Sequence, residues 1–183
     1  VAICEAKGIE AISDFWSIDI ANKILKEKGP ADIITATNVF AHVDNVKEFI
    51  SAAKILLKPN GVLVLEFPYL IDFIENFEFD TIYFEHLSYF SITPLLALSH
   101  QVDMKIIRVE KQNIHGGTVR VILTPRKSEL FAEPSVSEFL NREKFVGYDF
   151  IEKYKSWETA IKNIITEFST KILDLKKSGH KIA

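Results

Sequence analysis

The stretch ADIITATNVFAHVDNVKEFISAAKILLKPNGVLVLEF, residues 31–67, has the pattern of one βαβ unit. Its first part, Ala31–Thr37, is a continuous apolar run, which is typical of a strand covered on both faces. Residues 44–57 then place apolar side chains three or four positions apart, which predicts a helix with one buried stripe. Pro59-Asn60-Gly61 predicts a tight turn into Val62–Phe67, the most apolar strand of the chain.

The same alternation of strands and helices extends on both sides of this unit. The further predicted elements are a strand at Glu10–Ser13, helices at Asp14–Lys28 and Pro94–His100, and strands at Lys105–Val109 and Thr118–Leu123. The last two strands are close enough in sequence to form an antiparallel pair at a sheet edge. Together these elements predict an α/β fold, with a twisted, mostly parallel sheet and helices on both sides.

After Pro125 the pattern becomes helical, with a short helix expected at Ser135–Asn141 and a long one at Tyr148–Lys177. The apolar stripe of the long helix is typical of packing and carries no chemistry. We therefore expect a sheet domain over residues 1–126, a helical linker over 127–178, and the start of a further domain at 179–183. Both ends resemble interrupted elements, so the sequence predicts a piece of a longer protein.

Composition narrows the function classes. The 22 basic residues are scattered among 25 acidic ones for a net charge of −3, which gives no basic surface for nucleic acid. A single cysteine, Cys4, excludes an intrachain disulfide and a cysteine-based zinc site. No apolar run is long enough to span a bilayer, and the first residues lack the pattern of a secretory signal. We expect a cytoplasmic, soluble protein; the sequence does not indicate its oligomeric state.

In open α/β sheets, ligands bind at the carboxyl ends of the strands, so the residues that follow each predicted strand are candidates. These residues are Asp14 and Phe15, then Asn38 and His42, then Glu66, Pro68 and Tyr69. Asp14 and Phe15 could bind the amine and cover the ring of an adenine, although Asp14 is equally suited to cap the following helix. Asn38 is as consistent with a turn as with a ligand contact.

Two further segments carry candidate groups. In Asp80–Phe90, Tyr83 and His86 share a face if the segment is helical, and Tyr83 and Glu85 share one if it is extended. A histidine suits proton abstraction near neutral pH. In Ile114–Arg120, two glycines precede a strand, which permits close approach of a ligand or forms an ordinary turn. Taken alone, each segment is also compatible with a structural role. No histidine pair has the spacing of a zinc-binding helix, so no metal is expected.

Four runs together resemble the sugar C-methyltransferase family, which adds methyl branches to dTDP-linked keto-deoxysugars. The runs are ATNVFAHV (Ala36–Val43), PNGVLVLEFPYL (Pro59–Leu70), FDTIYFEHLSYFS (Phe79–Ser91) and IHGGTVR (Ile114–Arg120). The resemblance implies a Rossmann-like class I methyltransferase domain that uses S-adenosylmethionine. It also implies a zinc-binding N-terminal domain, a glycine-rich first turn and most of a C-terminal domain, none of which this sequence contains.

The resemblance further implies a mechanism and a set of site residues. A base removes the proton from a sugar carbon beside a C4 ketone, and the enolate attacks the sulfonium methyl group. His86 is the implied base, with Tyr83 and His42 beside the reacting carbon and Glu85 binding the sugar or tuning His86. Asp14, Phe15, Asn38 and Val39 are the implied contacts to the methyl donor. His115, Gly116, Gly117 and Tyr69 are the implied contacts to the nucleotide-sugar.

Two other functions fit the same sequence. One is an O- or N-methyltransferase acting on a different small molecule. The other is a methyltransferase-like module that binds a ligand without catalysing a reaction, although such a module has little use for His42, Tyr83, Glu85 and His86 together.

Overall fold

The computed structural model describes residues 1–114 and 116–182. The elements, in chain order, are α1 (Ala2–Ala6), α2 (Ile18–Lys28), β1 (Ala31–Thr37), the 3₁₀ helix η1 (Phe40–His42), α3 (Val46–Leu56), β2 (Leu57–Pro68), α4 (Leu70–Glu75), the 3₁₀ helix η2 (Phe79–Thr81), α5 (Ile92–Gln101), β3 (Met104–Gln112), β4 (Thr118–Pro125), α6 (Pro134–Val146) and α7 (Ile151–Lys177). No helix in these ranges is both long and apolar enough to cross a membrane.

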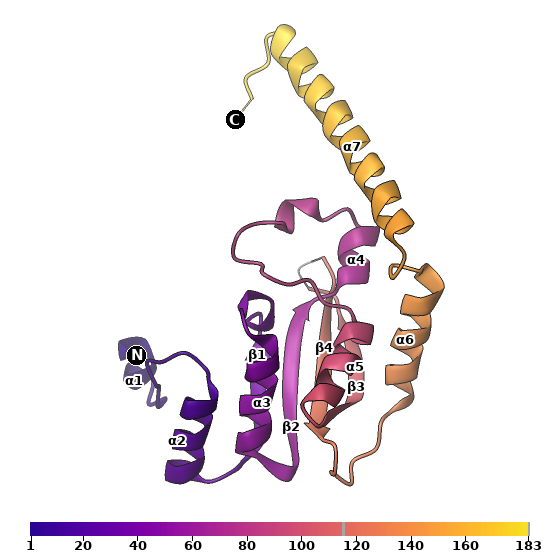
Figure 1. Cartoon of the computed structure of the whole chain (residues 1–183). Coiled ribbons are helices and arrows are strands. Elements are labelled where there is room, and N and C mark those ends of the chain that lie inside the picture. Colours follow the sequence, from indigo (N-terminus) through magenta and orange to yellow (C-terminus); the bar gives the residue numbers. More distant parts are fainter. Residues whose placement is uncertain (115, 183) are drawn as a thin grey trace.

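The strands form one sheet in the order β1-β2-β4-β3 (Figure 1). β1 and β2 are parallel, with Ile34 opposite Leu63, as the βαβ pattern predicts. β3 and β4 form the predicted antiparallel pair, and β4 also pairs antiparallel with β2, with Leu65 opposite Val121. The α/β class and the antiparallel edge pair are confirmed.

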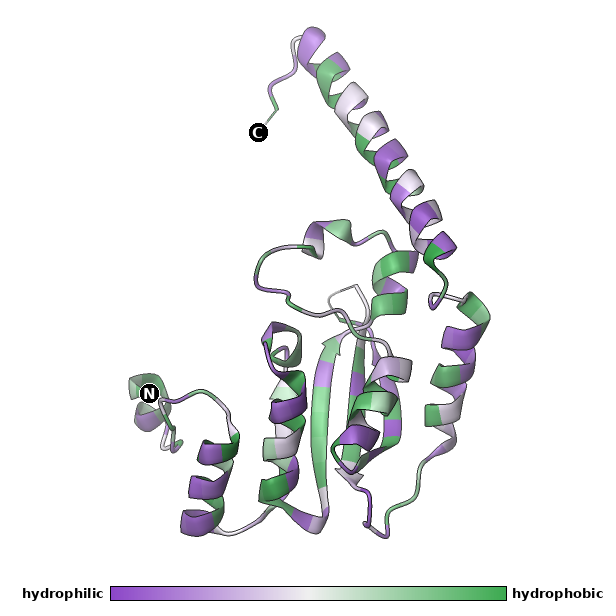
Figure 2. Cartoon of the chain, viewed as in Figure 1, coloured by the Kyte–Doolittle hydropathy of each residue, from purple (hydrophilic) through white to green (hydrophobic). Residues whose placement is uncertain are grey.

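One face of the sheet and the helices over it form the core. On β2, Leu63, Leu65 and Phe67 are fully buried, whereas the alternate residues Val62 and Val64 are half-buried. The buried side chains of α3 and α5 join the same apolar cluster, so α3 and α5 cover the same face (Figures 1 and 2). The expectation of helices on both faces is therefore wrong for the described part of the chain.

The N-terminal segment also differs from the prediction. Residues 10–13 form no strand, because they join no ladder of the sheet. The predicted helix at Asp14–Lys28 begins only at Ile18, since the Ser17 side chain is the N-cap and accepts from the Ile20 amide at 3.3 Å. Asp14 is therefore not a helix cap.

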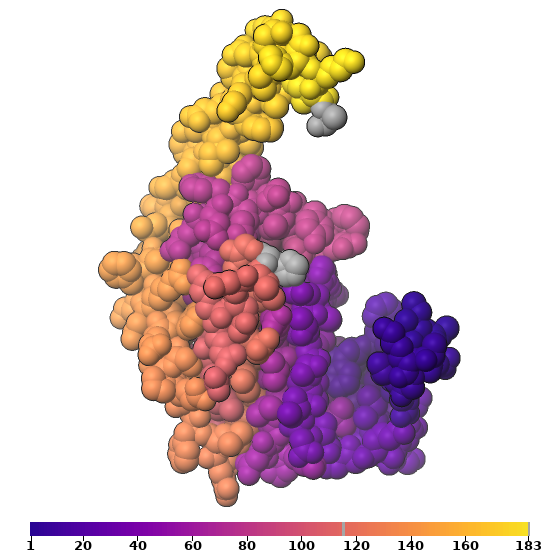
Figure 3. Space-filling view, turned by 180° about the vertical axis from the view of Figure 1, so that it is seen from behind, coloured from indigo at the N-terminus to yellow at the C-terminus, as the bar shows by residue number. Residues whose placement is uncertain are grey.

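The long helix α7 contacts the body only through its first turns. Trp157 packs against Phe73 with ring centroids 5.4 Å apart, and its indole N–H donates to the carbonyl of Ile74 at 3.0 Å. None of its residues is buried, and Phe168 is 65% exposed. Seen from behind, the C-terminal half of α7 extends away from the sheet domain (Figure 3).

Candidate active site

A cavity of about 300 Å³ lies at the carboxyl ends of β1 and β2. Three segments form its wall: the turn after β1, the end of β2 at Pro68, and the loop of residues 78–86. The described lining residues are Asn38, Ala41, His42, Pro68, Glu78, Thr81, Tyr83 and His86. Its place in the sheet is that expected for a ligand site in an open α/β fold.

The turn after β1 is fixed from both sides. Asn38 adopts a left-handed conformation with φ of 54°, which asparagine tolerates better than most residues, and its amide donates to the Glu66 carbonyl at 2.9 Å. Phe40 then enters the core, where its ring stacks on Phe90 with centroids 4.6 Å apart. Anchoring Phe40 in this way brings His42, two residues later, to the cavity wall.

The second wall is the loop that carries Tyr83 and His86. The amides of Leu87 and Ser88 both donate to the Ala41 carbonyl, at 2.9 and 3.2 Å, so the loop lies directly against η1. A tight turn, in which the His86 amide donates to the Tyr83 carbonyl at 3.0 Å, brings the two side chains together. The predicted i,i+3 juxtaposition is therefore present, although a turn produces it and not a helix.

The Tyr83 hydroxyl and His86 Nε2 are 3.1 Å apart, and the two rings are 4.2 Å apart between centroids. His86 Nδ1 lies 2.8 Å from the Thr81 carbonyl. Because a carbonyl can only accept, Nδ1 carries the proton and Nε2 presents its lone pair. Nε2 therefore accepts a hydrogen bond from Tyr83 and is the nitrogen available to take a further proton.

His42 is held in the same way. Its Nδ1 lies 2.8 Å from the Glu85 carbonyl, so this ring also keeps its proton on Nδ1 and leaves Nε2 as an acceptor. The His42 and His86 rings are 4.9 Å apart between centroids. Two imidazoles, each with its Nδ1 proton held by a backbone carbonyl, thus stand together at the cavity wall, which is an arrangement suited to general acid–base chemistry.

Glu85 acts here through its backbone. Its side chain is exposed and lines a neighbouring shallow groove with Phe84 and Leu87. The group that orients His86 is the Thr81 carbonyl, so the expected tuning of His86 by the Glu85 carboxylate has no counterpart in this geometry.

Of the four expected methyl-donor contacts, Asn38 and Val39 directly follow β1, and Asp14 and Phe15 precede α2. Asn38 lines the cavity, whereas Asp14, Phe15 and Val39 are exposed and are not among its described lining residues. Phe15 is 93% exposed, so its ring face is open to a ligand.

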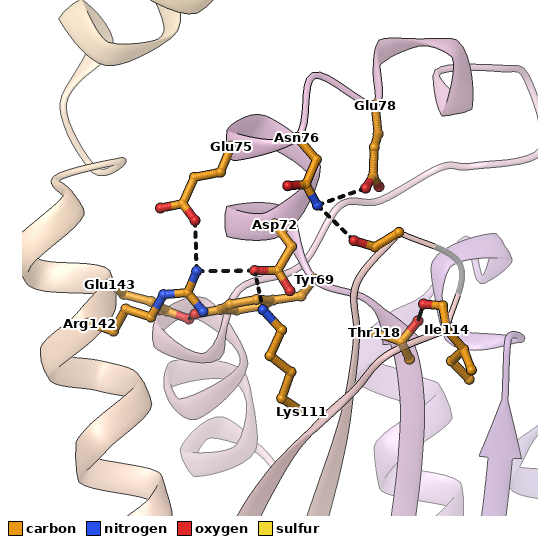
Figure 4. A network of polar contacts seen from close by, with 11 residues as sticks. Tyr69, Asp72, Glu75, Asn76, Glu78, Lys111, Ile114, Thr118, Arg142 and Glu143 are labelled. Atoms are coloured by element: carbon orange, nitrogen blue, oxygen red, sulfur yellow. Dashed lines mark hydrogen bonds and ion pairs between the residues drawn. The ribbon is translucent and has the colours of Figure 1, made fainter.

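Tyr69 has a structural role and not the expected contact to the sugar. It is fully buried, and its hydroxyl donates to Glu143 Oε1 at 2.9 Å (Figure 4). Burial, followed by the adjacent Glu143 carboxylate, raises the pKa of Tyr69. The prediction failed because a contact 74 residues away in sequence uses the hydroxyl.

The two glycines each make room for a carboxylate. Gly116 and Gly117 have φ of 77° and 147°, and a Cβ on Gly116 would overlap the Glu78 carboxylate. A Cβ on Gly117 would overlap the side chain of Asp72, which is buried and paired with Lys111 and Arg142 (Figure 4). In this structure the two glycines therefore allow close approach of protein side chains, those of Glu78 and Asp72. His115, another expected contact to the nucleotide-sugar, lies outside the described residues.

Sequence reasoning missed two cavity residues, Glu78 and Thr81. Thr81 contributes the carbonyl that orients His86, a backbone role that no side-chain motif could indicate. Glu78 lies just before the recognised run and within a group of acidic residues, so its sequence position gave no signal.

Comparisons with known proteins place the chain in a family. A family model described as a methyltransferase domain matches residues 6–109, and a model described as a C-methyltransferase C-terminal domain matches residues 113–183. The C-methyltransferase NovU of Streptomyces niveus is 25% identical over 181 residues, which are 99% of this chain and 43% of NovU. The chain therefore spans less than half the length of this relative.

Solved structures give weaker matches. A SAM-dependent methyltransferase from Anabaena variabilis has a TM-score of 0.48 and 17% identity, over 68% of this chain and 64% of that one. The magnesium protoporphyrin IX methyltransferase of Synechocystis, solved with bound SAH, has a TM-score of 0.41 and 11% identity, over 52% of this chain and 45% of that one. The methyltransferase domain model matches residues 6–109, which are more than half of this chain. The chain therefore belongs to the methyltransferase domain family, with the C-methyltransferases as its relatives.

Proposed function

We propose that the protein containing this chain transfers a methyl group from S-adenosylmethionine to a ring carbon, C3, of a nucleotide-linked 4-keto-deoxysugar. The matches to a methyltransferase domain and a C-methyltransferase C-terminal domain support carbon methylation. The observation that carries the proposal is the imidazole of His86, whose Nδ1 is held by the Thr81 carbonyl and whose Nε2 faces the Tyr83 hydroxyl at the cavity.

Carbon methylation requires a base, because a sugar carbon becomes nucleophilic only after it loses a proton. A ketone at C4 makes the hydrogen on C3 acidic, and His86 Nε2 removes it, leaving an enolate. Nε2 has one lone pair, so the Tyr83 hydroxyl turns away from it as the C3 proton arrives and can then donate to the enolate oxygen. His42, at 4.9 Å from His86 between ring centroids, is close enough to take part in holding the same oxygen or in relaying the proton.

The residues at the end of β1 suit the methyl donor. S-adenosylmethionine, when bound, supplies the electrophilic methyl group. Asn38 offers an amide side chain at the cavity wall, Asp14 a carboxylate that can accept from an exocyclic amine, and Phe15 an open aromatic face. These are the groups that an adenosine-containing ligand needs, and holding both substrates in place contributes much of the rate.

The direct test is His86→Ala in the full-length protein. Turnover should fall by roughly two to four orders of magnitude, the usual contribution of a general base. Binding of S-adenosylmethionine, measured by calorimetry, should barely change. His100→Ala is a matched control, because His100 is exposed at the end of α5, away from the cavity. Turnover of His86→Ala close to that of the control would remove His86 from the role of base.

A second measurement separates carbon methylation from the alternatives. In deuterated water and without methyl donor, the wild-type protein should exchange the C3 hydrogen of a dTDP-linked 4-keto-deoxysugar, and His86→Ala should not. An O- or N-methyltransferase has no need to remove that proton. Absence of exchange together with methyl transfer would indicate an oxygen or nitrogen acceptor, and failure to bind S-adenosylmethionine would indicate a non-catalytic module.

A further inference from the structure

We infer that Glu78 is a specificity-determining residue of this cavity, whose carboxylate accepts a hydrogen bond from a hydroxyl or ammonium group on the acceptor sugar. The inference rests on the proposed function and adds to it the class of substituent that the site selects.

The backbone of Glu78 is fixed relative to His86. Its amide donates to the Phe73 carbonyl at 3.0 Å, at the end of α4, and its carbonyl accepts from the amide and the hydroxyl of Thr81, at 3.1 and 2.9 Å. The Thr81 carbonyl in turn holds His86 Nδ1 at 2.8 Å. Thr81 therefore links the backbone of Glu78 to the imidazole of His86 by hydrogen bonds. The loop thus sets the position of these two residues relative to each other.

The Glu78 carboxylate is oriented by two further contacts. Asn76 Nδ2 donates to Glu78 Oε1 at 3.0 Å and to the Gly116 carbonyl at 2.7 Å, which ties the carboxylate to the loop before β4 (Figure 4). The carboxylate packs against Gly116, at a position that a Cβ would occupy. Within the described residues, the hydrogen bonds of this carboxylate use Oε1, and Glu78 is one of the residues that line the cavity.

The charge of the cavity wall decides which ligand group fits. Of the eight described lining residues, Glu78 alone carries a formal charge when the histidines are neutral. A half-buried carboxylate gains most from a hydrogen-bond donor and repels an anion. The phosphates of a nucleotide-sugar are therefore disfavoured in this cavity, and the sugar ring, with an O–H or N–H group beside the reacting carbon, is favoured.

The test compares Glu78→Ala and Glu78→Gln with wild type in the full-length protein. The acceptors are a dTDP-linked 4-keto-deoxysugar with a hydroxyl at C3 and its 3-amino counterpart. Loss of a hydrogen bond to a charged group corresponds to about a 10- to 100-fold weakening, so Glu78→Ala should raise KM for both acceptors by that factor and change kcat little. Glu78→Gln should restore most of the loss for the hydroxyl acceptor and little of it for the ammonium acceptor.

Asp80→Asn is the matched control, because Asp80 is an exposed acid in the same loop and is not among the described lining residues. If Glu78→Gln and Glu78→Ala both fold and both keep the wild-type KM for the acceptors, the inference is overturned. A weaker Kd for S-adenosylhomocysteine with an unchanged acceptor KM would also overturn it, because that result would assign Glu78 to the ammonium of the methyl donor. Calorimetric binding of the two sugars to wild type and to Glu78→Ala tests the role of Glu78 independently of methyl transfer. If no methyl transfer occurs, that result refutes the proposed function and not the role of Glu78.

Discussion

Replacing Glu143 by glutamine should strongly destabilise the fold. The Glu143 carboxylate is 6% exposed and accepts four hydrogen bonds: from the Tyr69 hydroxyl at 2.9 Å, the Ile92 amide at 2.6 Å, and the amide and hydroxyl of Thr93 at 2.8 and 2.6 Å. Ser91, the N-cap residue of α5, makes no side-chain capping bond. Glu143 therefore caps α5 from α6 and ties both helices to the start of α4.

The size of this loss of stability follows from the number of hydrogen-bond donors from which the glutamine amide can no longer accept. A glutamine keeps one acceptor oxygen, and its NH₂ group faces amide or hydroxyl donors, so about two of the charge-assisted bonds are lost. At ~1.5–3 kcal/mol for each, with partial rearrangement, the free energy of unfolding should fall by about 3 kcal/mol. For a domain of this size, that corresponds to a decrease in Tm of roughly 6–12 °C. Tyr69→Phe, which removes one donor to this carboxylate only, should cost about 1.5–3 kcal/mol.

Urea unfolding followed by circular dichroism measures these differences, with the slope m as a check that the unfolded state is unchanged. Glu138→Gln is the matched control, because Glu138 is an exposed acid on the same helix α6. If Glu143→Gln unfolds within about 0.5 kcal/mol of this control, the carboxylate does not hold the helices together and the reasoning is refuted.

Two further predictions concern the same region. Gly117→Ala should lower the free energy of unfolding by about 2–4 kcal/mol, because a Cβ would overlap the buried Asp72 side chain. Gly179 also has a positive φ, but a Cβ there would meet nothing within 4 Å. Gly179→Ala should therefore lower the free energy of unfolding clearly less in the same urea titration. Burial and Glu143 raise the pKa of Tyr69, so the unfolded chain releases this proton above pH 10 while the folded chain keeps it. Between pH 10 and 11 wild type should therefore lose about 1 kcal/mol more stability than Tyr69→Phe, and equal losses would contradict the assignment.

Much of the candidate site could be predicted from local sequence. Tyr83 and His86, three residues apart, do face each other, and Asn38 and His42 do follow a strand that ends at the cavity. The buried role of Tyr69 and the contact of the Glu85 carbonyl with His42 could not be predicted, because the use of these polar groups depends on which distant segments pack against them. Glu78 gave no signal, since its place in the cavity wall depends on how the loop of residues 78–86 folds against the ends of β1 and β2.

The sequence by itself determined the α/β class, the βαβ unit of residues 31–67, the antiparallel edge pair and the kinship with methyltransferases. The three features of the fold follow from hydrophobic periodicity and turn residues, which act over a few neighbouring positions, whereas the kinship follows from the resemblance of four sequence runs to a known family. The tertiary structure alone decided that α3 and α5 share one face, that backbone carbonyls set the tautomers of His42 and His86, and that Glu143 caps α5. Each of these depends on contacts between segments far apart in the chain, whose geometry is fixed only when the whole core packs.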